Sequence, residues 1–302
     1  MTKTAEPPQP LIIGTALVVA GAMLFSLKGI FIKLAYQYGV DVVTLMSLRM
    51  GIALPFYVLI GCWSFFQHRQ QRLTYLQTLQ IFGIGIIGYY TASYLDLSGL
   101  TFIAASLERL ILYMYPSMVL ILSVIFLKEK ITRRQIVVLC TGYVGVILFM
   151  LDGVAVPGDG LVQGSLLVLA SALSFAIFIL LSGKMIPNVG SVRFTTLAMT
   201  AASAAILLHY VITKGMMIPD QPIQVWGYAA LIAVFSTVLP SFLMAAGIAR
   251  VGASNASLLG AVGPATTAIL AVYILDEPFG LAHFFGLLLV VLAVLMLARE
   301  KR

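Results

Sequence analysis

Six residues inside the long apolar segments of this 302-residue chain are candidates for a functional site, four of them charged and two of them tyrosines. They are Lys28, Arg49, Tyr89, Tyr90, Glu108 and Arg109. An ionisable side chain at the centre of a membrane helix costs about 2.5–3.5 kcal/mol, so it usually faces the protein interior or a water-filled cavity. A guanidinium can hold a carboxylate, and a desolvated carboxylic acid can exchange a proton. These residue types therefore indicate a polar cavity for a small charged solute.

The elements that position these residues must be membrane helices. Apolar residues make up 61% of the chain and charged residues 10%, with a mean hydropathy of +1.05. A soluble domain carries about 45–50% apolar residues and about 25% charged residues. This composition therefore disfavours soluble enzymes, nucleic-acid modules, disordered chains and disulfide scaffolds. The apolar runs are continuous over about twenty residues, which favours helices over the alternating strands of a barrel. We predict an all-α membrane protein.

Ten segments are long enough to cross a hydrocarbon core of about 30 Å. The expected spans are 11–36, 42–66, 75–97, 101–127, 134–151, 161–184, 191–213, 225–248, 253–275 and 280–298. Residues 1–10 form a polar tail before the first span, and the connections are short.

The basic residues indicate the orientation of these helices. Of the 18 lysines and arginines, thirteen fall on one side if both ends of the chain are cytoplasmic: Lys3, Arg69, Arg72, Lys128, Lys130, Arg133, Arg134, Lys184, Arg193, Arg250, Arg299, Lys301 and Arg302. Only Lys214 falls on the other side. This bias predicts a multi-pass protein with both termini in the cytoplasm.

An internal repeat divides the chain. Residues 105–130 align without a gap on residues 253–278, an offset of 148, and nine of the 26 positions are identical. We therefore expect two five-helix repeats, at 11–151 and 161–298. Because five is odd, the second repeat enters the membrane from the opposite side, and such inverted repeats are typical of secondary transporters.

The six candidate residues share one depth, about 10–12 Å below the outer surface at 1.5 Å per residue. Neighbouring residues on a helix point about 100° apart, so Glu108 and Arg109 cannot both face the cavity. We expect Glu108 to face inward as the candidate for proton coupling, and Arg49 to hold a substrate carboxylate or to pair with Glu108. The alternative is a fixed ion pair of Glu108 with Arg49 or Lys28, with Arg109 reaching toward the outer headgroups.

Other residues have weaker predictions. Asn255 is expected to line the cavity near the inner side. Pro116 and Pro264 should kink two helices, either as hinges or as static bends. Lys33 is expected to reach toward the outer headgroups, and Asp96 to cap a helix or face water.

Two segments resemble a known family. Each has a proline followed by a short acidic segment: Pro116 before Leu127, Lys128, Glu129, Lys130, Ile131 and Thr132, and Pro264 before Leu275, Asp276, Glu277, Pro278 and Phe279. They resemble the EamA-type, ten-helix members of the drug/metabolite transporter superfamily, although Lys128 and Asp276 replace the usual glycine. The resemblance implies a bacterial inner-membrane protein that exports amino acids, other metabolites or toxic compounds.

The expected function is secondary active transport, with export of amino acids or related carboxylate-bearing solutes by alternating access. The alternatives are a multidrug-type efflux carrier for lipophilic cations and an uncoupled facilitator or channel. The sequence contains no HExxH, GxSxG or Walker motif, so an enzyme is not expected. We expect no metal, cofactor or nucleic acid, and a monomer whose partners are its substrate, the lipid bilayer and, if transport is coupled, protons.

Overall fold

The structure is a computed structural model that describes residues 9–67, 73–103, 108, 111–150, 160–216, 220–260, 262–275 and 280–298. Within these residues every regular element is helical, and no strand occurs. The elements are α1 (Gln9–Tyr36), α2 (Val42–Gln67), α3 (Tyr75–Gly85), η1 (Ile86–Thr91), α4 (Ala92–Gly99), α6 (Tyr115–Leu127), α7 (Arg133–Met150), α8 (Leu161–Val189), α9 (Ser191–Lys214), α10 (Ile223–Ala233), η2 (Val234–Val238), α11 (Leu239–Val251), α12 (Ala253–Leu259), α13 (Val262–Leu275) and α14 (Leu281–Ala298).

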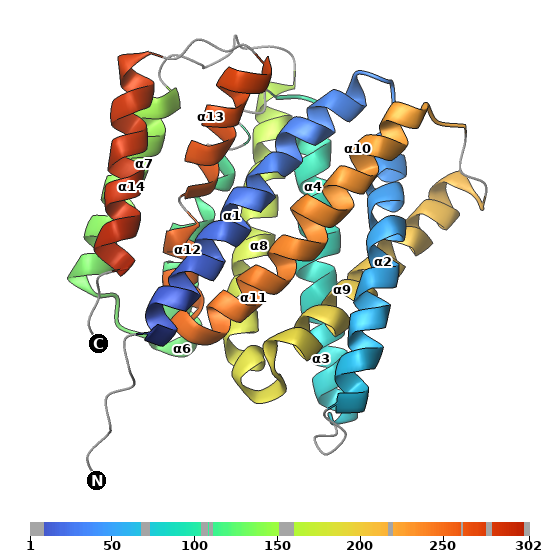
Figure 1. The fold of residues 1–302 in the computed structure, drawn as a ribbon, viewed down its shortest axis with the longest axis horizontal. Helices are drawn as coiled ribbons and strands as arrows, with labels where there is room; N and C mark the ends of the chain where they lie inside the picture. Colours follow the sequence, from blue (N-terminus) through green and yellow to red (C-terminus); the bar gives the residue numbers. More distant parts are fainter. Residues whose placement is uncertain are drawn as a thin grey trace.

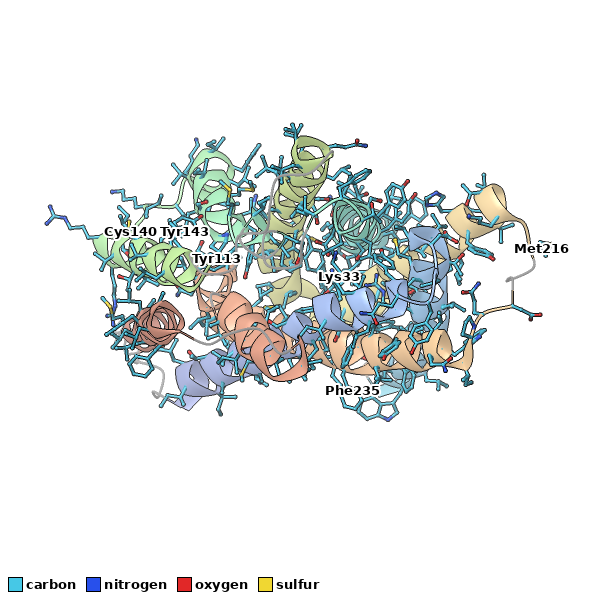
Figure 2. All side chains as sticks on the ribbon, turned by 90° about the horizontal axis from the view of Figure 1, so that it is seen from above. Lys33, Tyr113, Cys140, Tyr143, Met216 and Phe235 are labelled. Atoms are coloured by element: carbon cyan, nitrogen blue, oxygen red, sulfur yellow. The ribbon has the colours of Figure 1, made fainter. Side chains whose placement is uncertain are left out.

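Five helical stretches of the described chain are long and apolar enough to cross a bilayer. They are Leu11–Tyr36, Val42–Phe65, Leu161–Val189, Ser191–Lys214 and Ile223–Val251. Large apolar side chains such as Phe235 lie exposed at the edge of the bundle, whereas Lys33 lies toward its middle (Figure 2). An exterior with so many apolar side chains suits lipid as the surrounding solvent. The helices run between two ends of the bundle, and α1 begins at the end where α14 finishes (Figure 1).

Helices from distant parts of the sequence pack closely where glycines face one another. Helix α1 packs on α11, and α4 packs on α8. An added Cβ on Gly247 of α11 would lie 2.3 Å from Val18, and one on Gly99 of α4 would lie 2.5 Å from Val168. Small residues permit this backbone approach, which is how membrane helices associate without a hydrophobic driving force.

Two of the long helices contain a π-helical segment near their middle. Segment η1 joins α3 to α4, and η2 joins α10 to α11, so each set of three elements is one continuous rod. The wide turn closes with backbone bonds from Ala92 to Ile87 and from Leu239 to Val234. A π segment adds one residue to a turn and is frequent at functional sites. It changes which side chains the rest of the rod directs inward.

The expected spans 101–127 and 253–275 are interrupted helices rather than continuous, kinked ones. Tyr113 and Met114 form a turn, and α6 begins at Tyr115 with Pro116 in its first turn. Likewise α12 ends at Leu259, and Pro264 lies in the first turn of α13. Proline lacks an N–H group, which the first turn of a helix does not need, so each helix restarts there.

The corner between α1 and α2 is held by Asp41. Its Oδ1 accepts hydrogen bonds from the backbone N–H groups of Val43 (3.1 Å) and Thr44 (3.2 Å), and Lys214 Nζ lies 3.5 Å from its Oδ2. Partial burial alone would raise the pKa of the Asp41 carboxyl. The hydrogen bonds from Thr44 and the charge of Lys214 outweigh that effect, so this pKa lies below its usual value.

Candidate functional site

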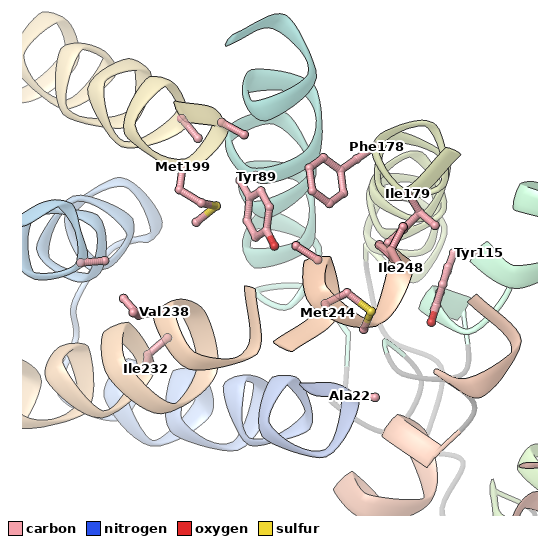
Figure 3. Close-up of a cluster of buried hydrophobic side chains, with 14 of the residues drawn as sticks. Ala22, Tyr89, Tyr115, Phe178, Ile179, Met199, Ile232, Val238, Met244 and Ile248 are labelled. Carbon is pink, nitrogen blue, oxygen red and sulfur yellow. The ribbon is translucent and has the colours of Figure 1, made fainter. Parts of the chain in front are cut away.

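A cavity with an empty volume of about 880 Å³, part of it open to the surroundings, lies between the two halves of the chain. Its wall comes from α1, α2, the α3–η1–α4 rod, α8, the α10–η2–α11 rod, and the first turns of α6 and α13 with the residues just before them. Ala22, Tyr89, Tyr115 and Met244 belong to this wall and come from four different parts of the chain (Figure 3). Sequence-distant segments therefore converge on one central space.

The cavity contains an ion pair that the sequence analysis did not anticipate. Lys28 Nζ donates to Asp96 Oδ2 at 2.5 Å, and the two side chains are 15% and 2% exposed. The expectation that Asp96 would cap a helix or face water is wrong. It follows Tyr89 by seven residues, about two helical turns, and both line the cavity. That spacing is the sequence signal that could have identified it.

Arg49 of α2 brings a second positive charge to the wall. Its side chain is buried, with 2% of the residue exposed, and among the described residues its Nε and Nη2 have no hydrogen-bond partner. These two nitrogens lie on the same edge of the guanidinium, the edge whose parallel N–H groups bind a carboxylate through two hydrogen bonds. The Tyr89 hydroxyl and the Asp96 carboxylate interact electrostatically with this guanidinium.

The second half of the chain contributes hydroxyl groups through η2. Ser236 and Thr237 both line the cavity. Thr237 Oγ1 donates to the carbonyl of Ile232 at 2.9 Å, five residues earlier, which matches the π register. Ser236 is 1% exposed, and its Oγ has no partner in the part of the chain that the structure describes. A buried hydroxyl without a partner is costly, so Ser236 is a candidate ligand for a molecule in the cavity.

Aromatic rings form another part of the wall. The Tyr115 ring meets the Phe175 ring edge-to-face at 5.3 Å, and Tyr89 meets Phe178 in the same manner at 4.9 Å. Figure 3 shows Tyr89 beside Phe178 and Tyr115 on the other side of Met244. The Tyr115 hydroxyl donates to the carbonyl of Ser257 at 3.1 Å. This part of the wall is suited to an apolar or aromatic group.

Side chains from the first half of the chain donate hydrogen bonds to carbonyl groups beside the interruption between α12 and α13. Ser257 O, near the end of α12, accepts the hydrogen bond from Tyr115. Gly263 O accepts a bond of 2.8 Å from Ser26 Oγ of α1. An added Cβ on Gly260 would lie 1.7 Å from the Tyr115 hydroxyl, so a larger residue there would displace the Tyr115 side chain. These bonds tie the first half of the chain to the second beside the cavity.

The structure separates the six residues expected in one layer. Lys28, Arg49 and Tyr89 line the cavity. Tyr90 instead hydrogen-bonds through its hydroxyl to Nδ1 of His209 at 3.1 Å, between η1 and α9. Glu108 is fully buried but is not among the described residues that line the cavity. Arg109 lies outside the described residues.

The alternative of a fixed ion pair of Glu108 with Arg49 or Lys28 stays a prediction, and Lys28 pairs with Asp96. The charge of Glu108 acts on Lys33. Lys33 does not reach for headgroups: its Nζ donates to the carbonyls of Leu100 (3.0 Å) and Ile103 (3.1 Å), just beyond the end of α4. A lysine at the carbonyl end of a helix is favoured by the helix dipole.

Asn255 lies at a different place from the central cavity. Its Oδ1 accepts a hydrogen bond of 3.3 Å from Gln135 Nε2 of α7, and Ser254 Oγ next to it donates to Glu129 Oε2 at 3.2 Å. These residues line a separate hollow near the start of α12. They connect the two halves at that end of the bundle.

An apolar helical bundle with charges buried around a central cavity defines an integral, multi-pass membrane protein. A model of the EamA-like transporter family matches residues 12–151 and again residues 162–299. The chain therefore belongs to the EamA-like transporter family, within the drug/metabolite transporter superfamily, and is a transporter.

Similar proteins span nearly the whole chain. An uncharacterized transporter of Bacillus subtilis, YcbK, is 29% identical over 280 residues, covering 90% of this chain and 88% of that protein. An uncharacterized transporter of Archaeoglobus fulgidus is 25% identical over 288 residues, covering 95% of this chain and 97% of that protein. A solved crystal structure shares the fold with a TM-score of 0.74 at 16% identity, covering 94% of this chain and 97% of the other.

Proposed function

We propose that this transporter is a secondary active carrier that exports small carboxylate-bearing metabolites, such as amino acids or related solutes, by alternating access. The observation that carries the proposal is the buried edge of Arg49. Two parallel donors without a partner in the described chain line a central cavity. A bound carboxylate would accept hydrogen bonds from both donors and balance the positive charge of Arg49.

We propose ten membrane crossings in two inverted repeats, at 11–151 and 161–298, preceded by a cytoplasmic tail at 1–10. The double match of the family model, to 12–151 and 162–299, supports this division. The π segments add support, because η1 begins at Ile86 and η2 at Val234, the same offset of 148 as in the sequence repeat. We propose that both termini lie in the cytoplasm and that the membrane is the bacterial inner membrane.

The packing of the bundle also supports two equivalent halves. In α1 the pair Gly14 and Val18 faces Gly247 of α11, and in α8 the pair Gly164 and Val168 faces Gly99 of α4. The offsets are 150 for the α1 and α8 residues and 148 for Gly99 and Gly247. Exchanging the two halves of the chain therefore turns the contact of α1 with α11 into the contact of α8 with α4. Such an exchange provides two related conformations with the cavity open to opposite sides.

The interruptions before Pro116 and Pro264 are proposed as the hinges of this change. Proton coupling through Glu108 is proposed as its driving force. Glu108 is fully buried and acts electrostatically on Lys33. Protonation of Glu108 would therefore change the charge balance beside the cavity and not in the cavity wall. Glu108→Gln should abolish the dependence of transport on a pH gradient, and an unchanged dependence would leave Glu108 as a structural residue.

Counterflow in proteoliposomes tests the carrier mechanism. Vesicles are preloaded with an unlabelled solute, and uptake of the same labelled solute is followed for amino acids, monocarboxylates and lipophilic cations. A carrier of carboxylates gives a transient accumulation of labelled carboxylate, which Arg49→Lys reduces. Arg250→Lys is the matched control, because Arg250 is exposed on α11 and donates a hydrogen bond to the carbonyl of Ala246 in its own helix.

The outcome of counterflow separates the alternatives. Passive equilibration without accumulation identifies a channel or facilitator. Accumulation of lipophilic cations alone identifies a multidrug-type carrier and refutes the proposed substrate class.

A further inference from the structure

The described wall of the cavity carries three charged residues, Lys28, Arg49 and Asp96. Lys28 and Asp96 neutralise each other at 2.5 Å, which leaves the charge of Arg49 in excess. A buried charge without compensation is strongly unfavourable in a low-dielectric surrounding. The described part of the wall thus carries a net charge of +1.

The described residues of the second half do not balance that charge. At the offset of 148, Asp96 corresponds to Met244 and Tyr89 to Thr237, and both Met244 and Thr237 line the cavity. The first half therefore supplies the charged groups of the described wall. The second half supplies hydroxyl, thioether and aromatic groups, including Phe175.

Two features place a ligand anion against Arg49. Its Nε and Nη2 provide the edge that suits a planar oxyanion. Ser236 Oγ provides one more buried polar atom without a partner in the described residues, on η2, which packs against α2 where Arg49 lies. An oxyanion between α2 and η2 would engage both halves of the chain at once.

We infer that the cavity selects a ligand with a net charge of −1 and an apolar body, a monocarboxylate in preference to a zwitterion, with Ser236 as an additional ligand residue. This inference rests on the proposed function and narrows its substrate class. A monocarboxylate balances Arg49 and leaves the Lys28–Asp96 pair intact. The ammonium of a zwitterion would need a carboxylate, and the one in the described wall, Asp96, is already engaged by Lys28.

The apolar part of the ligand would contact the aromatic and thioether side chains of the wall. Phe175 and Met244 of the second half and Tyr115 of the first half line the cavity, and they offer rings and a thioether. Such groups give contact area to an aromatic or aliphatic chain without requiring hydrogen bonds. The described wall thus offers the Arg49 guanidinium to a carboxylate, and rings and a thioether to the rest of the ligand.

Four probes of the same shape test this inference. 3-Phenylpropionate, L-phenylalanine, 3-phenylpropionamide and 2-phenylethylamine share a phenyl ring and a short chain but are anionic, zwitterionic, neutral and cationic. Isothermal titration calorimetry on the full-length protein in lipid nanodiscs measures each affinity. We expect 3-phenylpropionate to bind at least ten-fold more tightly than L-phenylalanine, and the amide and the amine to bind more weakly than either.

Two variants locate the binding site. Arg49→Gln should remove the preference for 3-phenylpropionate over its amide. Ser236→Ala should weaken 3-phenylpropionate by about five-fold, as expected for one hydrogen bond. Ser236→Ala changes one small side chain, so it keeps the test informative if Arg49→Gln fails to fold. A Ser236→Ala affinity equal to that of the wild type would refute the role of Ser236.

The failure of this inference is distinguishable from failure of the proposed function. If L-phenylalanine binds as tightly as 3-phenylpropionate and Arg49→Gln weakens both, the carboxylate carrier stands and the preference for a monoanion is refuted. If 2-phenylethylamine binds best, both are refuted. If none of the probes binds, the inference is refuted, and counterflow alone decides the proposed function.

Discussion

Replacing Arg49 by methionine should separate function from stability. Methionine is similar in length and apolar, so the variant removes the guanidinium without leaving a large cavity. Arg49 is 2% exposed, and two of its donors lack partners in the described chain. A carboxylate bound to both donors gains about 1.5–3 kcal/mol from each charge-assisted bond, about 3–6 kcal/mol in all. Loss of these two hydrogen bonds should weaken carboxylate binding by roughly 10²- to 10⁴-fold, since each step of about 1.4 kcal/mol corresponds to a ten-fold change in the dissociation constant.

The same replacement should not destabilise the protein without its ligand. A buried charge that is incompletely paired opposes folding, and an apolar side chain of similar size is often neutral or stabilising. We therefore expect the apparent melting temperature of Arg49→Met, measured without ligand by differential scanning fluorimetry, to equal or exceed that of the wild type.

Asp96→Asn provides the contrast, because it breaks the 2.5 Å ion pair and leaves Lys28 without a counter-charge. Removing one partner of a buried pair costs about 3–5 kcal/mol, so this variant should melt well below the wild type. If Arg49→Met melts as low as Asp96→Asn and still binds carboxylates normally, Arg49 is a structural residue and the reasoning is refuted.

Three further predictions follow from the packing and the hydrogen bonds. Tyr89→Phe should reduce transport in the counterflow assay, whereas Tyr90→Phe should retain it, because only the first of these tyrosines lines the cavity; equal losses would place both in the site. Gly85→Ala should lower the melting temperature by several degrees, because its Cβ would lie 2.1 Å from a backbone oxygen of α9, while Gly83→Ala, with nothing within 4 Å, should not. Asp41→Asn should lower the free energy of unfolding at pH 7 by under about 1 kcal/mol, because the ion pair of Asp41 with Lys214 is exposed. Folding lowers the pKa of the Asp41 carboxyl, so the stability difference between Asp41→Asn and the wild type is present above the usual pKa of an aspartate. The difference should vanish as the pH falls through the lowered pKa. A difference in stability that persists in acid would contradict this prediction.

The sequence by itself determined the class of the protein and the approximate positions of its helices. The composition required lipid as the solvent, and the expected spans 42–66 and 191–213 lie within one residue of α2 and α9. The repeat and the acidic segments after Pro116 and Pro264 indicated the family that the chain matches. These features depend on composition and on spacing along one chain, so they can be read without knowing which helices meet.

The tertiary structure decided which side chains face the cavity. Tyr89 and Tyr90 are adjacent, yet one lines the cavity and the other bonds to His209, because neighbouring residues point about 100° apart on a helix. The π segments change that direction further, and hydropathy does not reveal them. The pairing of Lys28 with Asp96 likewise joins distant segments, so it depends on how α1 and α4 are rotated and placed in the bundle.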